Sequence, residues 1–331
     1  MGRQRRGGDD LQRLADIPAM AKLAKEFTVT PAKEKLADAA AAIVLAPDAA
    51  DPAFMARQLV QCTLPHTNPG DDKPAWTRKN GNVALVLQPG WDADKGRPLG
   101  YPYGTIPRLL LFWITTEAVR TKRRRLELGH TLSEFMRELG LTPSSAGAGK
   151  RGDANRLKEQ MRRLFNCRIS FQAVIQDPHR HGERTRNMEV TTDSELWWST
   201  REPSQGVLWG SWVELGERFF EAITTKPIPF DMRALRALKR SPLALDLYAW
   251  ICYRAFSIVQ NNHPPQFIPW QQLMQQLGSD YEDVKDFKKK AQPALRKVQA
   301  VYPGLTIAAA HGGFTIHANR LATPQRQLSD R

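Results

Sequence analysis

The sequence is poor in cysteine, and its three cysteines, Cys62, Cys167 and Cys252, lie far apart. No C-x-x-C pair and no His–Cys spacing typical of zinc ligation occurs, so neither a zinc module nor a disulfide framework is expected. Long apolar runs are also missing, because the longest, Leu109 to Ile114, is far too short to cross a bilayer. A secretory signal would have an apolar segment after its charged start, and the start of this sequence, MGRQRRGGDD, is not followed by one. We therefore expect buried thiols in a reducing cytoplasm and no contact with a membrane.

Acidic residues are in deficit, with 34 Asp and Glu against 48 Lys and Arg. The formal net charge is +14 and the sequence pI is near 9.9. A protein this cationic usually binds a polyanion, and nucleic acid is the commonest one. The alternative is a basic surface that serves only solubility.

Patterns typical of enzymes are absent too, since no Ser-His-Asp order, paired catalytic carboxylates or acidic metal cluster is found. One loop, SSAGAGKRGD at residues 144–153, is glycine-rich and basic. It fails as a nucleotide-binding P-loop, because Ser144 stands at the first glycine position, Arg151 replaces the Ser or Thr, and a helix precedes it. We expect no cofactor. Lys150 and Arg151 are instead predicted to contact backbone phosphates, with Asp153 capping the next helix; the alternative is a solvated loop.

From Thr105 onward the sequence predicts a helix, a short strand, a helix, the loop, a basic helix and a hairpin. Thr131 and Glu134 form a capping box, and Gly140 closes that helix. This order is typical of a winged-helix domain, in which the hairpin is the wing. The basic helix has an apolar face of Leu157, Met161, Leu164 and Phe165, and its predicted DNA contacts lie on the opposite face: Arg156, Lys158, Arg162 and Arg163. Further contacts are predicted at the tip of the wing: Arg180, Arg184 and Arg186.

The same order of elements returns after Ser241, which is predicted to cap a helix with Pro242 in its first turn. The pair Leu139-Gly140 recurs as Leu277-Gly278. A second basic helix repeats the apolar spacing, although Pro293 inside it is expected to bend it. Its predicted DNA contacts are Lys285, Lys288, Lys289 and Lys290.

Two diverged copies of one fold explain this recurrence. The predicted fold class is α+β, with two tandem winged-helix domains related by internal duplication. Residues 1–58 are predicted to form a loosely attached arm, helical or partly disordered. The first winged-helix domain is placed at 59–230 with its preceding strand segment and a Trp-rich linker that packs between the domains. The second is placed at 231–320 and a tail at 321–331.

The strings YPYGTIPRLLLFWITTEAVRTKRRRLELGHTLSEFMRELGL and RLKEQMRRLFNCRISF resemble the plasmid-encoded RepA-type replication initiators. The resemblance covers roughly residues 95–320. It implies tandem winged-helix domains that bind repeated sites (iterons) in double-stranded origin DNA, help to open the duplex and need no nucleotide. It also implies the host initiator ATPase and replicative helicase as partners, and a possible homodimer.

Two other functions use the same residue pattern. A winged-helix transcriptional repressor, acting on its own promoter for example, would present the same DNA-binding residues. A structural or RNA-binding protein is supported less, because the aromatic strands and repeat codes of RNA modules are not found.

Overall fold

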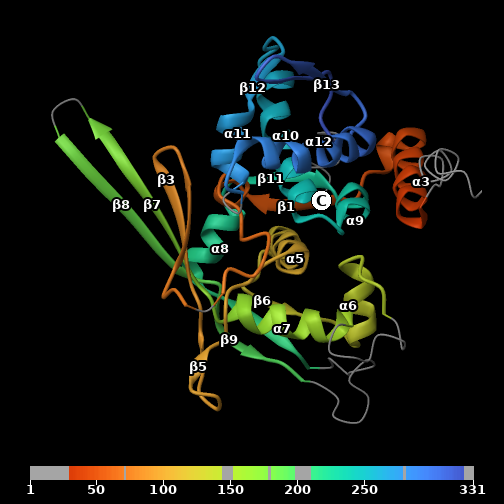
Figure 1. Cartoon of the computed structure of the whole chain (residues 1–331). Coiled ribbons are helices and arrows are strands. Elements are labelled where there is room, and N and C mark those ends of the chain that lie inside the picture. Colours follow the sequence, from red (N-terminus) through yellow and green to blue (C-terminus); the bar gives the residue numbers. More distant parts are fainter. Residues whose placement is uncertain are drawn as a thin grey trace, which may run out of the picture.

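The computed structural model describes residues 30–70, 72–143, 152–177, 180–197, 210–278 and 281–323. Helices and strands are mixed along the chain, so the predicted α+β class is confirmed (Figure 1). Within these described ranges, no helix is both long enough and apolar enough to cross a membrane.

The first half of the chain has the predicted order of elements: α5 (Thr105–Thr121), β6 (Arg125–Glu127), α6 (Leu132–Glu138), α7 (Asp153–Phe165), β7 (Arg168–Asp177) and β8 (Arg180–Glu189). The Thr131 hydroxyl accepts a hydrogen bond from the N–H of Glu134 at 3.1 Å, which confirms the predicted cap of α6. Gly140 follows α6 with a φ of 72°, a backbone conformation that favours glycine. A Cβ at this position would lie 2.7 Å from Cγ of Arg236, so only glycine fits here without a shift.

The second half repeats the order: α10 (Pro242–Gln260), β12 (Gln266–Pro269), α11 (Trp270–Leu277), α12 (Val284–Val301), β13 (Leu305–Ala310) and β14 (Gly313–Ala318). The Ser241 hydroxyl caps α10 as predicted, accepting a hydrogen bond from the N–H of Ala244 at 3.2 Å. The three strands pair antiparallel in the order β12-β14-β13. The short strand thus pairs with the last strand of the hairpin, as in a winged helix. Helix α12 continues through Pro293.

The sheet pairing of the first half differs from that arrangement. The hairpin β7–β8 joins β2 (Trp76–Asn80) and β3 (Val83–Gln88) in a sheet of order β2-β3-β7-β8. Strand β6 pairs instead with β10 (Trp212–Leu215), which also pairs with β9 (Thr191–Glu195). The hairpin therefore does not pair with β6. The two halves have the same order of elements, but their strands pair differently. An internal duplication stays a prediction.

Residues 31–56 pack on the rest of the protein through α3 (Pro31–Leu45), the 3-10 turn Pro47–Ala49 and β1 (Pro52–Ala56). Strand β1 pairs with β11 (Pro227–Asp231), and Ala53 and Met55 are buried. Helix α3 lies against α9 (Met232–Leu238) and α12. The prediction that this segment is helical is confirmed by α3, although Val44 and Leu45 on that helix are exposed. The prediction that the segment is loosely attached is wrong, because β1 and Ile43 are part of the core. Residues 1–29 lie outside the described ranges.

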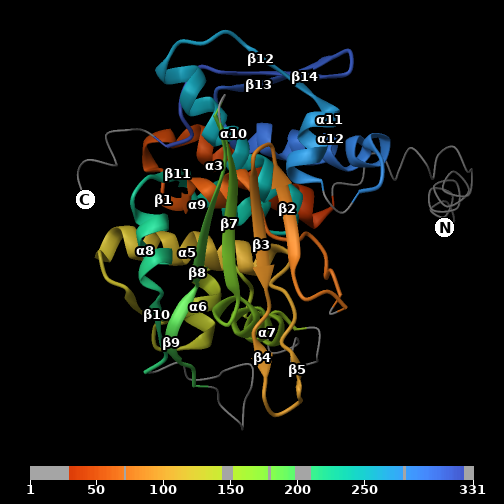
Figure 2. The same cartoon turned by 90° about the vertical axis from the view of Figure 1, so that its left-hand side faces the viewer.

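The remaining elements are α4 (Arg57–Gln61), α8 (Glu217–Thr224), and the small antiparallel pair β4 (Trp91–Asp92) and β5 (Arg97–Pro98), which lies at the lower end of the molecule in Figure 2. The prediction that the tryptophans pack between two domains is wrong for the two that are described. Trp197 is 56% exposed. Trp212 lies on β10, and the guanidinium carbon of Arg125 lies over its ring, 3.9 Å from the ring centroid. Trp198 and Trp209 lie outside the described residues.

The core is continuous from one half to the other. Phe112 on α5 makes an edge-on contact with Phe230 on β11 at 5.2 Å between ring centroids. Phe230 in turn contacts Tyr248 on α10 at 6.1 Å, and Tyr248 contacts Tyr302 at the end of α12 at 6.4 Å. This row of aromatic side chains joins α5 to α12 through buried apolar surface.

A buried ionic cluster also joins the halves. The Arg108 guanidinium on α5 donates two hydrogen bonds, of 2.7 and 2.8 Å, to the Asp246 carboxylate on α10. His66 Nε2 lies 2.8 Å from the same carboxylate, so we infer that this nitrogen carries the donated proton. Arg108 also donates to the carbonyls of Leu64, Pro65 and Gly104 at 2.6 to 3.0 Å.

All three side chains of this cluster are almost inaccessible to water. The Arg108 guanidinium and the hydrogen bonds it donates outweigh burial and hold the pKa of Asp246 well below its usual range. Burial lowers the pKa of His66, so the imidazole is neutral at pH 7.

We expect Asp246→Asn to lower the free energy of unfolding by about 3–5 kcal/mol, because it leaves the Arg108 charge buried without its counter-charge. Urea denaturation followed by circular dichroism measures the change. Asp94→Asn, at an exposed carboxylate, is the control and should change little. Equal stability of Asp246→Asn and the wild-type protein would contradict this account of the cluster.

Stability should also fall as the pH is lowered. Both Asp246 and His66 have lowered pKa values in the folded protein, so the unfolded chain binds more protons below their ordinary values of 3.8 and 6.5. The free energy of unfolding should therefore decrease first as the pH falls through the region near 6.5, and again below about pH 4. Urea titrations from pH 8 to about pH 2.5 cover both decreases. In His66→Gln the first decrease should be smaller, and an unchanged pH profile would refute the assignment.

Candidate nucleic-acid interface

Helix α7 is amphipathic, as its sequence predicts. Leu157, Met161 and Leu164 recur at the spacing of one helical face and are fully buried. Gln160 belongs to the same face, where its side-chain oxygen accepts a hydrogen bond from the N–H of Tyr103 at 2.9 Å. Burial of this face turns the charged residues of the helix towards its outer sides.

Three of the four predicted contacts on α7 lie on those outer sides. Arg156 and Arg162 are about half exposed, and form ion pairs with Asp153 at 3.2 Å and Asp92 at 3.6 Å. The Arg156–Asp153 pair is exposed on both sides and contributes little to stability, so Arg156 is available to an incoming anion. Asp92 is different, because its side chain is only 6% exposed and it also pairs with Lys95 at 3.2 Å. Lys158 is half-buried, and burial lowers the pKa of its amine.

Arg163 does not lie on the exposed face, and that prediction is wrong. Its side chain is only 12% exposed, donates to the carbonyl of Tyr101 at 3.1 Å and pairs with Glu159 at 2.6 Å. Its guanidinium group also lies over the ring of Tyr103, 5.3 Å from the centroid. The segment before α5 covers this side of α7, so Arg163 holds that segment in place.

The start of α7 also differs from the prediction. Asp153 is the first residue of the helix and not its cap, because the N-cap position is taken by Gly152, which has no capping side chain. The Asp153 carboxylate instead pairs with Arg156. Lys150 and Arg151 lie outside the described residues, so their phosphate contacts stay predictions.

The predicted wing is the hairpin β7–β8, which extends away from the helices in Figure 1. Arg184 and Arg186 are not at its tip. Arg186 is half-buried opposite Phe171, about 20 Å along the strand from the start of β8. Because side chains alternate across a strand, both arginines share a face with Ile169 and Met188, the buried pair at the base of the hairpin. Arg180 begins β8, and its side chain is not among those described.

Helix α12 presents every lysine that the sequence predicts. Phe287, Ala291 and Leu295 face the core, while the four predicted residues are exposed: Lys285, Lys288, Lys289 and Lys290. The Lys288 amine lies 5.9 Å from the ring centroid of Trp270 on α11. Arg296 is exposed as well, at i+7 from Lys289 and so on the same side of the helix. That spacing could have identified it from the sequence.

The two basic helices lie one above the other. In both views α12 is above α7, with α9 and α5 between them (Figures 1 and 2). Each helix buries its apolar face in the shared core and presents its charges outward. A single chain thus carries two cationic helices whose relative position is set by packing.

Lys239 and Arg240, in the turn between α9 and α10, are basic residues that the sequence analysis missed. Burial lowers the pKa of Lys239, and so does its neighbour Arg240, while Asp153 at the start of α7 raises it. Arg240 is exposed and, together with Arg156, lines a pocket of about 330 Å³. No pattern in the sequence indicates that this turn lies near α7, because the two segments are far apart along the chain.

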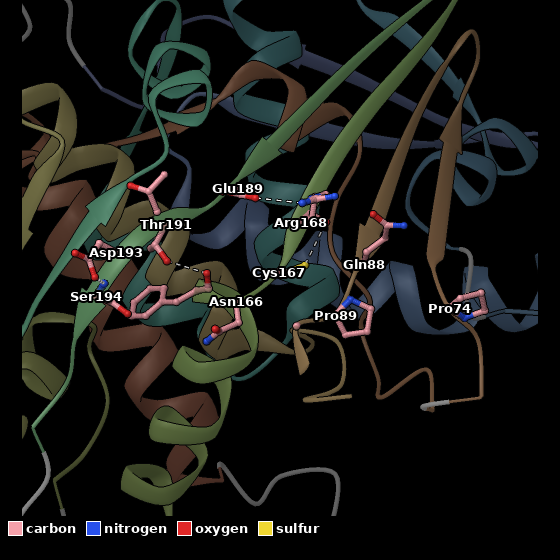
Figure 3. A pocket seen from close by; sticks show the side chains of 13 residues that line it. Pro74, Gln88, Pro89, Asn166, Cys167, Arg168, Glu189, Thr191, Asp193 and Ser194 are labelled. Atoms are coloured by element: carbon pink, nitrogen blue, oxygen red, sulfur yellow. Dashed lines mark hydrogen bonds and ion pairs between the residues drawn. The ribbon is translucent and has the colours of Figure 1, made fainter. Parts of the chain in front are cut away.

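A second pocket, of about 640 Å³, lies where α7 ends and β7 begins (Figure 3). Its walls are held by the Arg168–Glu189 ion pair at 3.2 Å and by the Thr191 hydroxyl, which donates to the carbonyl of Phe165 at 2.8 Å. Cys167 lines it, but burial raises the pKa of its thiol to about 12, so it is protonated at pH 7. This thiol is therefore not an activated nucleophile.

Within the part of the chain that the structure describes, no group of three His, Cys, Asp or Glu side chains is arranged to hold a metal ion.

Comparisons with known proteins identify a family. The model of the family described as plasmid-encoded RepA protein matches residues 101–272, just over half of the chain. Two crystal structures of domains 2 and 3 of RctB are similar to this chain, each with 12% sequence identity over 78% of it. They are covered over 94% and 95% of their lengths, with TM-scores of 0.42 and 0.47. No curated protein matches the chain.

We expect Arg163→Ala to lower the free energy of unfolding by about 1–3 kcal/mol, because it removes a charged donor from a largely buried carbonyl and from Glu159. Arg156→Ala, at an exposed position on the same helix, should change stability by no more than about 0.5 kcal/mol. Urea denaturation of the two variants measures the difference. Equal effects would contradict the structural role of Arg163.

Proposed function

This chain belongs to the plasmid-encoded RepA family of replication initiators, and we propose that it binds repeated double-stranded sites (iterons) at a plasmid origin. One observation carries the proposal: two basic helices, α7 and α12, each present exposed cations from a single packed body. The net charge of +14 supplies the long-range attraction to DNA.

The two helices suit successive contacts along one duplex. A helix of this kind fits the major groove, where arginine reads guanine edges and lysine neutralises phosphates. Because packing fixes the two helices relative to each other, the protein favours DNA that is shaped to meet both. We propose that this requirement strains the duplex and helps to open it, so the mechanism uses binding and deformation energy and no covalent chemistry.

Recruitment of the host initiator ATPase and the replicative helicase is part of the proposal. It requires surface that the DNA leaves uncovered, and helix α8, away from α12 at the left of Figure 2, offers such surface. We place the protein in the bacterial cytoplasm, where its origin lies, and homodimers are a further form to be tested. A repressor of its own promoter remains the second function to distinguish.

The test is a salt series on the purified full chain with two duplexes of equal length, its own plasmid origin and a scrambled sequence. Specific binding should favour the origin by about 10³ or more. Arg162→Ala on α7 and Lys289→Ala on α12 should each weaken binding, and each phosphate contact that is lost should flatten the log–log salt slope by about 0.9. Arg218→Ala, which removes an exposed charge from α8, is the matched control.

Equal affinity for the two duplexes at every salt concentration would refute the initiator function. The repressor would be favoured instead by a protein that binds the origin and represses a reporter promoter, but does not allow a plasmid carrying that origin to replicate in cells.

A further inference from the structure

A pocket of about 330 Å³ lies where the two halves of the protein meet. Its lining comes from the segment before α5, from the first turns of α5 and α7, and from the α9–α10 turn with the start of α10. The residues that matter for its chemistry are Arg156, Arg240, Glu159, Gly104 and Thr105. Elements from both halves are therefore needed to build it.

Two arginines from different halves line this pocket. Arg156 belongs to α7, and among the described residues its side chain pairs with Asp153 alone, in an exposed pair at 3.2 Å. Arg240 belongs to the α9–α10 turn, and no hydrogen bond or ion pair joins its side chain to another described residue. Glu159 also lines the pocket, but its carboxylate is already paired with Arg163 at 2.6 Å. The lining thus carries an excess of positive charge.

The backbone at the inner side of the pocket also suits an anion. The carbonyl of Gly104 accepts a hydrogen bond of 2.6 Å from the buried Arg108, which holds it toward the interior. Gly104 is the N-cap of α5 and has no side chain to cover the first turn of that helix. Other basic residues lie near Arg240: burial is the main cause that lowers the pKa of Lys239, and Arg240, Lys35 and Arg236 lower it further, while Asp153 raises it.

We propose that this pocket binds one phosphate group of the DNA backbone, held between Arg156 and Arg240. Guanidinium groups match the geometry of phosphate oxygens and form paired, charge-assisted hydrogen bonds with them. A phosphate held here touches both halves at once, so it fixes the register of the duplex relative to α7 and α12. This inference rests on the proposed DNA-binding function and assigns a particular contact within it.

The test uses Arg156→Gln, Arg240→Gln and the double variant, with Arg218→Gln as the matched control of charge. Ethylation of individual phosphates in the origin duplex locates those that the protein contacts. We expect one phosphate at which interference weakens in each single variant and disappears in the double variant. The double variant should flatten the log–log salt slope by about 0.9, the value for one phosphate, and not by the ~1.8 of two separate contacts.

Three results would overturn the pocket assignment. One is an unchanged interference pattern in Arg240→Gln. Another is loss of interference at two different phosphates in the two single variants. The third is calorimetric binding of inorganic phosphate that depends on Arg240 while the salt slope on DNA does not, because the pocket would then take a free phosphate. The wild-type preference for origin over scrambled duplex is measured separately, so failure of the proposed function is recognised independently of the pocket.

Discussion

The buried ion pair between Arg108 and Asp246 is the interaction on which the rest of the arrangement depends. It joins the first helix of one half to the first helix of the other, and His66 completes it from a preceding loop. Taking these charges out of water is unfavourable, and only the close geometry and the three carbonyls that Arg108 binds offset that penalty. The hydrogen bonds of this cluster form only when α5 and α10 are in this arrangement. The cluster therefore helps to determine how the two halves pack against each other.

That constraint extends to the cationic surface. Helix α7 packs on α5, and α12 packs on α10, so the ion pair between α5 and α10 also sets the distance between the two basic helices. The aromatic row from Phe112 to Tyr302 and the strand pair β1–β11 strengthen the same junction with apolar and backbone contacts. The proposed binding to repeated DNA sites would benefit from this rigidity, because flexible halves lose more entropy on binding.

Much of the local structure could be predicted from the sequence. The caps at Thr131 and Ser241, the buried faces of α7 and α12 and the exposed lysines of α12 all follow from spacing within one element. The partner of β6 could not be predicted, because β10 lies far along the chain and several short strands have similar patterns. Arg163 was misplaced for the same reason, since helical spacing alone does not show that Tyr101 and Tyr103 cover its side of α7.

The basic character of the protein, the order of its elements and the apolar face of each helix follow from the amino-acid sequence, because they depend on composition and on residues within a few turns of each other. Long-range packing, in contrast, sets which strands pair, joins residues 31–56 to the body, and brings Arg240 and Arg156 to one pocket. These features depend on contacts between distant segments. Such contacts form when the assembled core excludes water, and no local pattern encodes them.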